Sequence, residues 1–189
     1  FAVATIEEAL ALRKDGIALP IMLLGYTFPE YFEQAVENDI TITILSLKDA
    51  KILSAIAKKL GKTAKIHVAV DTGMSRIGFP PTKEGAFEVL EISLLDSVFL
   101  EGVFTHFATS DEKDKEFTHL QEKRFSEFKK MLINCDVNLP IYHCANSGAI
   151  MQHRDFSYDM VRPGIILYGL NPSDEVPKNL LDLIPAMEL

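Results

Sequence analysis

Short apolar runs alternate with amphipathic segments along most of the chain, and this pattern predicts the secondary structure. Runs typical of buried strands occur at residues 2–4, 20–25, 40–44, 64–71, 99–107, 141–146 and 160–169. Segments with apolar residues at helical spacing predict helices over 5–16, 28–39, 46–61, 83–93 and 114–133, with a shorter helix after residue 146. Two helix starts carry their own signal: Thr5 with Glu8 forms a capping-box pattern, and Ser46 is a candidate N-cap.

The order of these elements predicts an α/β fold. Strands that are apolar throughout and alternate with helices indicate a parallel sheet covered by helices. This pattern suits a (β/α)8 TIM-like barrel, of which about seven βα units are present, or an open doubly wound sheet. No G-x-G-x-x-G motif opens a helix, which counts against a dinucleotide-binding sheet. We favour the barrel because polar residues follow the later strands, where barrels carry their active sites: Asp71, His106, Asn146, Ser147 and Gly164.

Composition narrows the class of protein. The 189 residues are 48% hydrophobic, which is enough for one sizeable core. No apolar run reaches the roughly 18–20 residues of a membrane helix, and no secretory signal is recognisable. The formal net charge of −8 disfavours nucleic acid as a partner. Cys135 and Cys144 have no metal-binding or C-x-x-C spacing, which predicts reduced thiols in a cytoplasmic protein and no metal site.

Two loops after predicted strands carry candidate chemistry. The loop VDTGMSRIG (70–78) contains Arg76, which is either a solvated arginine on a capped loop or a cation aimed at a carboxylate or phosphate. His106 follows the apolar run GVF, and a lone histidine there is more often structural than catalytic. The side chains at 109–111 are expected to cap the helix that follows.

The last two predicted strands end in HCANSG and VRPGI. In barrels a phosphate site commonly forms between the final loops, so Ser147 and Gly164 are candidates to hold a phosphate. The alternative is an N-cap serine and a structural glycine. Arg162 lies in an apolar run where a charge is costly unless it is paired, and His143 on the neighbouring strand is placed to orient it.

Four motifs in order, VDTGMSRIGF, GVFTHFATSDE, HCANSGA and VRPGIILYG, resemble those of the alanine racemase family. The resemblance implies a pyridoxal phosphate enzyme of the cytoplasm that interconverts L- and D-alanine for cell-wall peptidoglycan. It also implies an N-terminal eight-stranded α/β barrel, a C-terminal β-domain, and a head-to-tail homodimer that shares its active sites. Residues 1–170 would then be the cofactor-binding barrel, and 171–189 the connection to the second domain.

The resemblance also assigns roles to residues. Ser147, Gly164 and Ile165 would hold the cofactor phosphate, and Arg162 would face the pyridine nitrogen with His143 hydrogen-bonded behind it. An arginine there is a poor proton donor and would leave that nitrogen unprotonated. Three further assignments concern the rest of the pocket: His106 beside the cofactor ring, Asn146 in the same pocket, and Met74 with Arg76 at the substrate carboxylate.

Three departures from the family pattern qualify this prediction. The V-V-K-A-D-A-Y-G-H-like motif that carries the cofactor lysine is absent, so the chain is expected to begin near the second barrel strand. The terminal PAMEL is expected to be the first few residues of the β-domain that carries the catalytic tyrosine. Ala69 stands where many members have a modified lysine that orients the arginine equivalent to Arg76.

These residues alone are therefore predicted to be inactive. The alternatives are a related serine or amino-acid racemase, a non-catalytic pyridoxal phosphate-binding barrel protein, and a phosphate-binding barrel of unrelated chemistry.

Overall fold

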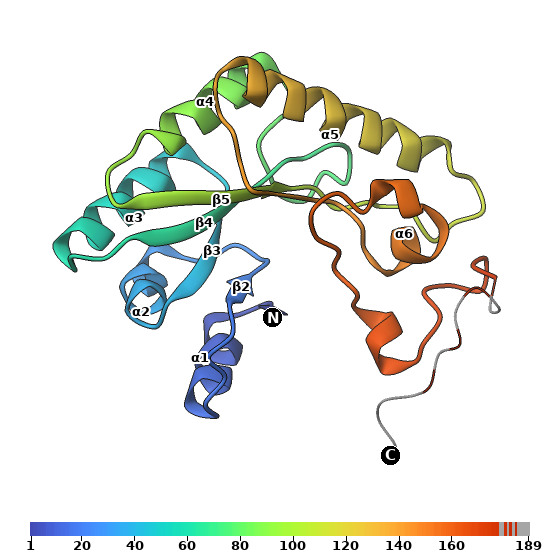
Figure 1. The fold of residues 1–189 in the computed structure, drawn as a ribbon, viewed down its shortest axis with the longest axis horizontal. Coiled ribbons are helices and arrows are strands. Elements are labelled where there is room, and N and C mark those ends of the chain that lie inside the picture. Colours follow the sequence, from blue (N-terminus) through green and yellow to red (C-terminus); the bar gives the residue numbers. More distant parts are fainter. Residues whose placement is uncertain (178–179, 181, 183, 185–189) are drawn as a thin grey trace.

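The computed structural model describes residues 1–177, 180, 182 and 184, which form a curved parallel sheet with helices along its outer side (Figure 1). The sheet has six strands, and every neighbouring pair is parallel. In chain order they are β1 (Ala2–Val3), β2 (Ile21–Leu23), β3 (Ile40–Ile44), β4 (Ala64–Ala69), β5 (Val98–Phe104) and β6 (Ile141–His143). In a doubly wound sheet the order of the strands in space reverses partway through the chain. Here each strand lies beside the one that precedes it in the chain, from β1 to β6. The predicted barrel fold is confirmed as an open, partial barrel.

In the described residues, six α-helices and three short 3-10 helices accompany the strands. The α-helices are α1 (Ile6–Lys14), α2 (Phe32–Glu37), α3 (Leu47–Lys59), α4 (Lys83–Ser93), α5 (Glu116–Asn134) and α6 (Ser147–Gln152). The 3-10 helices are η1 (Pro29–Tyr31), η2 (Arg154–Phe156) and η3 (Ile165–Tyr168). The predicted helix starts at Thr5, with a complete capping box, and at Ser46 are confirmed. In the part of the chain that is described, no helix is both long and apolar enough to cross a membrane.

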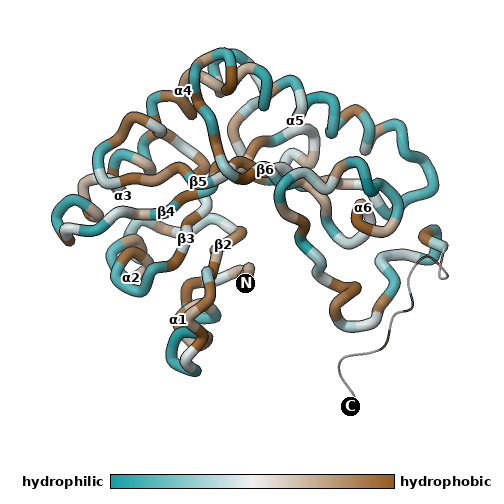
Figure 2. The backbone as a smooth tube through the Cα atoms, in the orientation of Figure 1, coloured by the Kyte–Doolittle hydropathy of each residue, from teal (hydrophilic) through white to brown (hydrophobic). Residues whose placement is uncertain are grey.

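The two faces of the sheet differ in chemistry. The outer face packs against the helices through one large apolar core, to which β3 contributes Ile40, Ile42 and Ile44. Teal and brown alternate along α5 in Figure 2, as expected of a helix with one face on a sheet. The inner face carries buried polar side chains, among them Thr41 and Thr43. The prediction that the strands are apolar throughout was therefore wrong at these positions, whereas Met22, Ala69 and Phe104 form a small separate apolar cluster.

A β-bulge in β5 sets which side chains reach the inner face. Ile66 of β4 pairs with Leu100, but the next residue, His67, pairs with Gly102. Glu101 is therefore an extra residue on β5, and the alternation of faces shifts there. A Cβ atom at Gly102 would lie 2.6 Å from Cε1 of the His67 ring, so only glycine allows the ring to cross this strand.

The predicted seventh strand at 160–169 is absent, and this prediction was wrong. The segment begins as a strand would, since Arg162 N–H donates to the Ala145 carbonyl at 2.9 Å. Pro163 then has no N–H to continue the ladder, and Gly164 has φ −106° and ψ −96°, outside the strand region. The chain turns into η3 instead. Arg162 thus lies in a loop and not in a strand.

Two other local predictions need correction or stay open. The segment 109–111 does not cap α5, whose N-cap is Lys115. The buried Ser110 hydroxyl donates instead to Asn146 Oδ1 at 2.6 Å. The domain boundary at 170/171 stays a prediction, and the PAMEL segment lies outside the described residues.

Candidate active site

A cavity of about 390 Å3 lies where the inner face meets the loops that follow β5 and β6. This volume lies within the range typical of small-molecule sites. The cavity brings together six of the residues that the sequence singled out: His106, Asn146, Ser147, Arg162, Gly164 and Ile165. Residues about 60 positions apart in the chain therefore share one concave surface at the carboxyl ends of the strands, as in barrel enzymes.

The Arg162 guanidinium group has four hydrogen-bond acceptors, of which His106 Nδ1, 3.4 Å from Nη2, is the most distant. Nη1 donates to His143 Nδ1 at 2.7 Å, and Nη2 donates to the carbonyl oxygens of Thr105 at 2.8 Å and Cys144 at 3.2 Å. The guanidinium also lies 5.3 Å from the centre of the Phe104 ring. Burial lowers the pKa of Arg162 to about 10, so the group stays cationic at neutral pH. Its Nε–H has no hydrogen-bond partner among the described residues, and Arg162 is one of the residues that line the cavity.

Backbone donors near Ser147 and Gly164 line the same cavity. The Gly164 N–H donates to Ser147 Oγ at 3.0 Å, which places the hydroxyl and the loop backbone side by side. The N–H groups of Ser147 and Gly148 belong to the first turn of α6 and have no intrahelical acceptor. The Ile165 N–H also has no hydrogen bond within the described part of the chain. These donors suit an anion such as phosphate.

Asn146, and not Ser147, caps α6. Its Oδ1 accepts from Ala149 N–H at 3.1 Å and from the Ser110 hydroxyl, while Nδ2 donates to the Phe107 carbonyl at 3.2 Å. The alternative in which Ser147 is the N-cap is therefore wrong. Asn146 lines the cavity, but these bonds show that its side chain joins the loops after β5 and β6.

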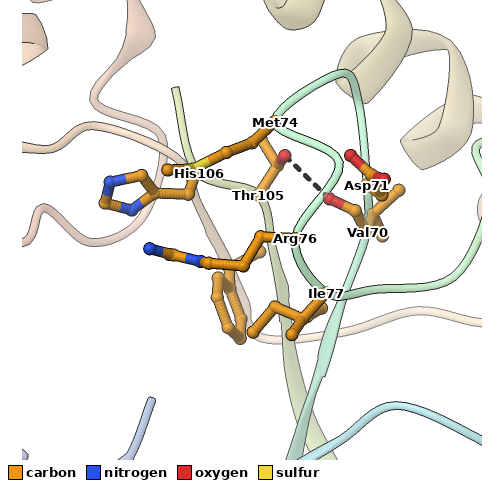
Figure 3. Close-up of a pocket in the computed structure, with 9 residues that line it drawn as sticks. Val70, Asp71, Met74, Arg76, Ile77, Thr105 and His106 are labelled. Carbon is orange, nitrogen blue, oxygen red and sulfur yellow. Dashed lines mark hydrogen bonds between the residues drawn. The ribbon is translucent and has the colours of Figure 1, made fainter. Parts of the chain in front are cut away.

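The loop after β4 carries the remaining predicted residues and is held by an aspartate. Asp71 Oδ1 accepts from the N–H groups of Gly73 at 3.0 Å and Ser75 at 2.8 Å. Figure 3 shows Met74 and Arg76 extending to the same side as His106. The Arg76 side chain is exposed and has no hydrogen bond among the described residues.

A second, small cavity of about 10 Å3 lies beside Ala69, Met74, Arg76 and His106. It has room for about one water molecule. Ala69 has no polar side-chain group, and no side chain among the described residues hydrogen-bonds to Arg76.

His106 lines both cavities and is electrically neutral at neutral pH. Burial, together with the charges of Arg162 and Arg76, lowers the pKa of His106 to about 4. A neutral imidazole between two arginines adds no third positive charge to the site.

Sequence reasoning missed three polar residues that support the site. Gln121 of α5 is fully buried: Nε2 donates to the His106 carbonyl at 3.1 Å, and Oε1 accepts from Ala108 N–H at 2.9 Å. Its helical phase with Phe125, Phe128 and Leu132 was a usable signal of burial. His67 and Glu101 continue the hydrogen bonding behind His143. The usable signal for this pair was Glu101 itself, a charged residue inside the apolar run 99–107.

These features define an α/β barrel domain with a cavity at the carboxyl ends of its strands, as barrel enzymes have. The cavity is lined by a hydrogen-bonded arginine and by backbone N–H donors. Residues 1–172 match the family model described as "Alanine racemase, N-terminal domain". The chain belongs to this family.

Three relatives illustrate the match. The alanine racemase of Clostridium perfringens strain SM101 is 50% identical over 188 residues, which cover 100% of this chain and 49% of that protein. A solved alanine racemase of Clostridium difficile 630 has a TM-score of 0.96 and 47% identity, covering 97% of this chain and 48% of that one. A histidine racemase from Leuconostoc mesenteroides subsp. sake has a TM-score of 0.86 and 31% identity, covering 98% and 49%. The chain spans about half the length of the relatives it matches.

Proposed function

We propose that this chain is the cofactor-binding barrel of an alanine racemase, which interconverts L- and D-alanine with pyridoxal phosphate for cell-wall synthesis. The observation that carries the proposal is Arg162: a cation that lines the cavity and is held by His143 and two backbone carbonyls, with no partner for its Nε–H among the described residues. Names of the close relatives support alanine as the substrate. The complete enzyme is proposed to be a cytoplasmic homodimer.

The residues present fit pyridoxal phosphate. Ser147 and the backbone of Gly164 and Ile165 would hold the phosphate, and Arg162 would donate to the pyridine nitrogen. When bound, the cofactor takes up the electron pair left as the α-proton of an amino acid is removed. His106, being neutral, would pack beside the ring without drawing charge from it. On the substrate side, the Met74 backbone and Arg76 would lie at the carboxylate.

Arginine suits position 162 because it donates a hydrogen bond without giving up its proton. With a pKa of about 10 it remains a poor acid at neutral pH. The pyridine nitrogen would then stay unprotonated, which weakens the electron sink but suppresses side reactions such as transamination. We propose that Arg162 sets this selectivity.

The chain alone is proposed to bind the cofactor without racemising alanine. Racemisation needs a base on each face of the reacting carbon, and the lysine and tyrosine motifs that supply them in the family do not occur in these residues. Both bases would come from the rest of the protein and from the second subunit.

The runner-up is a racemase for another amino acid, which the similarity to a histidine racemase favours. A non-catalytic pyridoxal phosphate carrier is the other alternative. All three hypotheses expect the cavity to bind the cofactor phosphate, so cofactor binding does not distinguish them. Turnover of specific amino acids does.

The test uses the intact protein. Pyridoxal phosphate is added, any imine to lysine is reduced with borohydride, and the adduct is mapped by mass spectrometry. D-amino acid formation from alanine, serine and histidine is then measured. A single lysine adduct outside these 189 residues, with alanine as the best substrate, supports the proposal. Preference for another amino acid contradicts the substrate, and cofactor binding without any turnover favours the carrier.

A further inference from the structure

Four polar side chains form a continuous line across the inner face of the sheet to Arg162. Glu101 Oε2 lies 3.2 Å from His67 Nε2, His67 Nδ1 lies 2.9 Å from His143 Nε2, and His143 Nδ1 lies 2.7 Å from Arg162 Nη1. The two histidines are 2% and 0% exposed. All four ring nitrogens are thus engaged by protein groups, and water has no access to replace them.

The two ends of this line fix the direction of every hydrogen bond. A guanidinium can only donate, so His143 Nδ1 must be an acceptor and the ring proton of His143 sits on Nε2. That proton is donated to His67 Nδ1, which leaves the His67 proton on Nε2. The last donation is to the Glu101 carboxylate, which can only accept.

Other proton arrangements place two donors against each other. A cationic His67 would donate to His143 Nε2, and the His143 proton would then face the Arg162 N–H. A protonated Glu101 that donates to His67 has the same result. Burial, which lowers the pKa of both histidines, favours the same neutral state.

The backbone of β5 is shaped to allow this line. The bulge makes Glu101 the extra residue on the strand, and Gly102 leaves the space that the His67 ring occupies. The Phe104 ring stacks on His143 with centres 4.9 Å apart and so fixes the plane of that ring. Each of the two histidines therefore has one available position.

We propose that His67 and Glu101 are positioning residues for Arg162: the carboxylate fixes the protonation form of both histidines, so that His143 presents a lone pair to the guanidinium. With Nη1 and Nη2 held in this way, the guanidinium group keeps a fixed orientation beside the cavity. The role at the pyridine nitrogen rests on the proposed function, whereas the proton arrangement does not.

The test is nitrogen-15 NMR of the histidine rings in the intact protein at neutral pH, without added cofactor. The expected result is that His67 and His143 are both neutral and both protonated at Nε2. Replacing Glu101→Leu removes the acceptor and is expected to shift or broaden the ring signals of both histidines. Glu101→Gln keeps an acceptor oxygen and is expected to restore the wild-type pattern. Glu127→Leu, an exposed position on α5, is the matched control for loss of charge.

A cationic histidine, an Nδ1 proton on His143, or unchanged ring signals in Glu101→Leu would overturn the proposal. If Glu101→Leu does not fold, the wild-type and Glu101→Gln spectra still decide it. A second readout is pyridoxal phosphate affinity, expected to weaken roughly tenfold in Glu101→Leu, equivalent to about 1.4 kcal/mol. Wild-type protein that shows the expected tautomers but binds no pyridoxal phosphate would refute the proposed function alone.

Discussion

Gly102→Ala should destabilise the fold far more than a single methyl group suggests. The added Cβ would lie 2.6 Å from Cε1 and 2.7 Å from Nδ1 of His67, and 2.8 Å from the Ile141 carbonyl oxygen. Overpacking of a core costs about 1–3 kcal/mol. Displacing the His67 ring also breaks its buried bond to His143, which adds about 1–3 kcal/mol for unsatisfied groups. The expected loss is therefore about 2–6 kcal/mol of a total that is typically 5–15 kcal/mol.

Urea unfolding of the intact protein, followed by circular dichroism, measures this loss as a lower midpoint at unchanged slope. Gly61→Ala is the control, because its Cβ would meet nothing within 4 Å and only the positive φ of 63° is strained. That control is expected to cost roughly 1–2 kcal/mol. In a His67→Ala background the ring is gone, so Gly102→Ala should cost at least about 1 kcal/mol less. A loss below about 0.5 kcal/mol, or costs that simply add, would refute the steric argument.

Four other changes have expected outcomes. Arg162→Glu in the intact protein should raise the ratio of transamination to racemisation with alanine, measured as pyruvate against D-alanine; an unchanged ratio would contradict the selectivity role. Ser147→Ala should weaken pyridoxal phosphate binding by about 1.5–3 kcal/mol, the worth of a hydrogen bond to a charged group, and should also lower the unfolding midpoint because the Gly164 N–H loses its acceptor. Gln121→Leu should lower stability by about 1–3 kcal/mol because the Ala108 N–H loses its acceptor. His106, with a pKa of about 4 in the folded state against an ordinary 6.5, makes the unfolded state bind more protons between these values, so stability should fall as pH drops from about 6.5 to 4, and a flat profile of unfolding midpoints would contradict this.

Much of the fold was predictable because burial on one side imposes a period on the sequence. The run ITITI and the capped helix from Ser46 were recognisable since β-branched residues and N-caps have local causes. The seventh strand was not excluded, because the apolar residues of 160–169 match a strand. The decisive fact is the missing N–H of Pro163 at the point where the ladder would continue.

The residues that line the cavity could be singled out from the sequence, whereas the polar residues behind it could not. His106 and Ser147 follow predicted strands, and Arg162 is a charge inside an apolar run, which made them candidates. The resemblance to the family motifs, and not position alone, assigned their roles. The contribution of His67 and Glu101 depends on a one-residue bulge, which changes the face that each side chain reaches. A bulge leaves little mark on a hydrophobic pattern, so the inner face was read as apolar.

The strand order has a consequence for how the chain is assembled during synthesis. Each strand pairs with the one made just before it, and the widest separation within a pair is 39 residues, between Gly102 and Ile141. Such local pairing allows the units to dock one after another as they leave the ribosome, from the N-terminus onward. Of the four side chains in the line from Glu101 to Arg162, Arg162 is the last to be synthesised. By then both histidines and the two carbonyl acceptors are in place, so the positive charge enters a pocket that is already able to receive it.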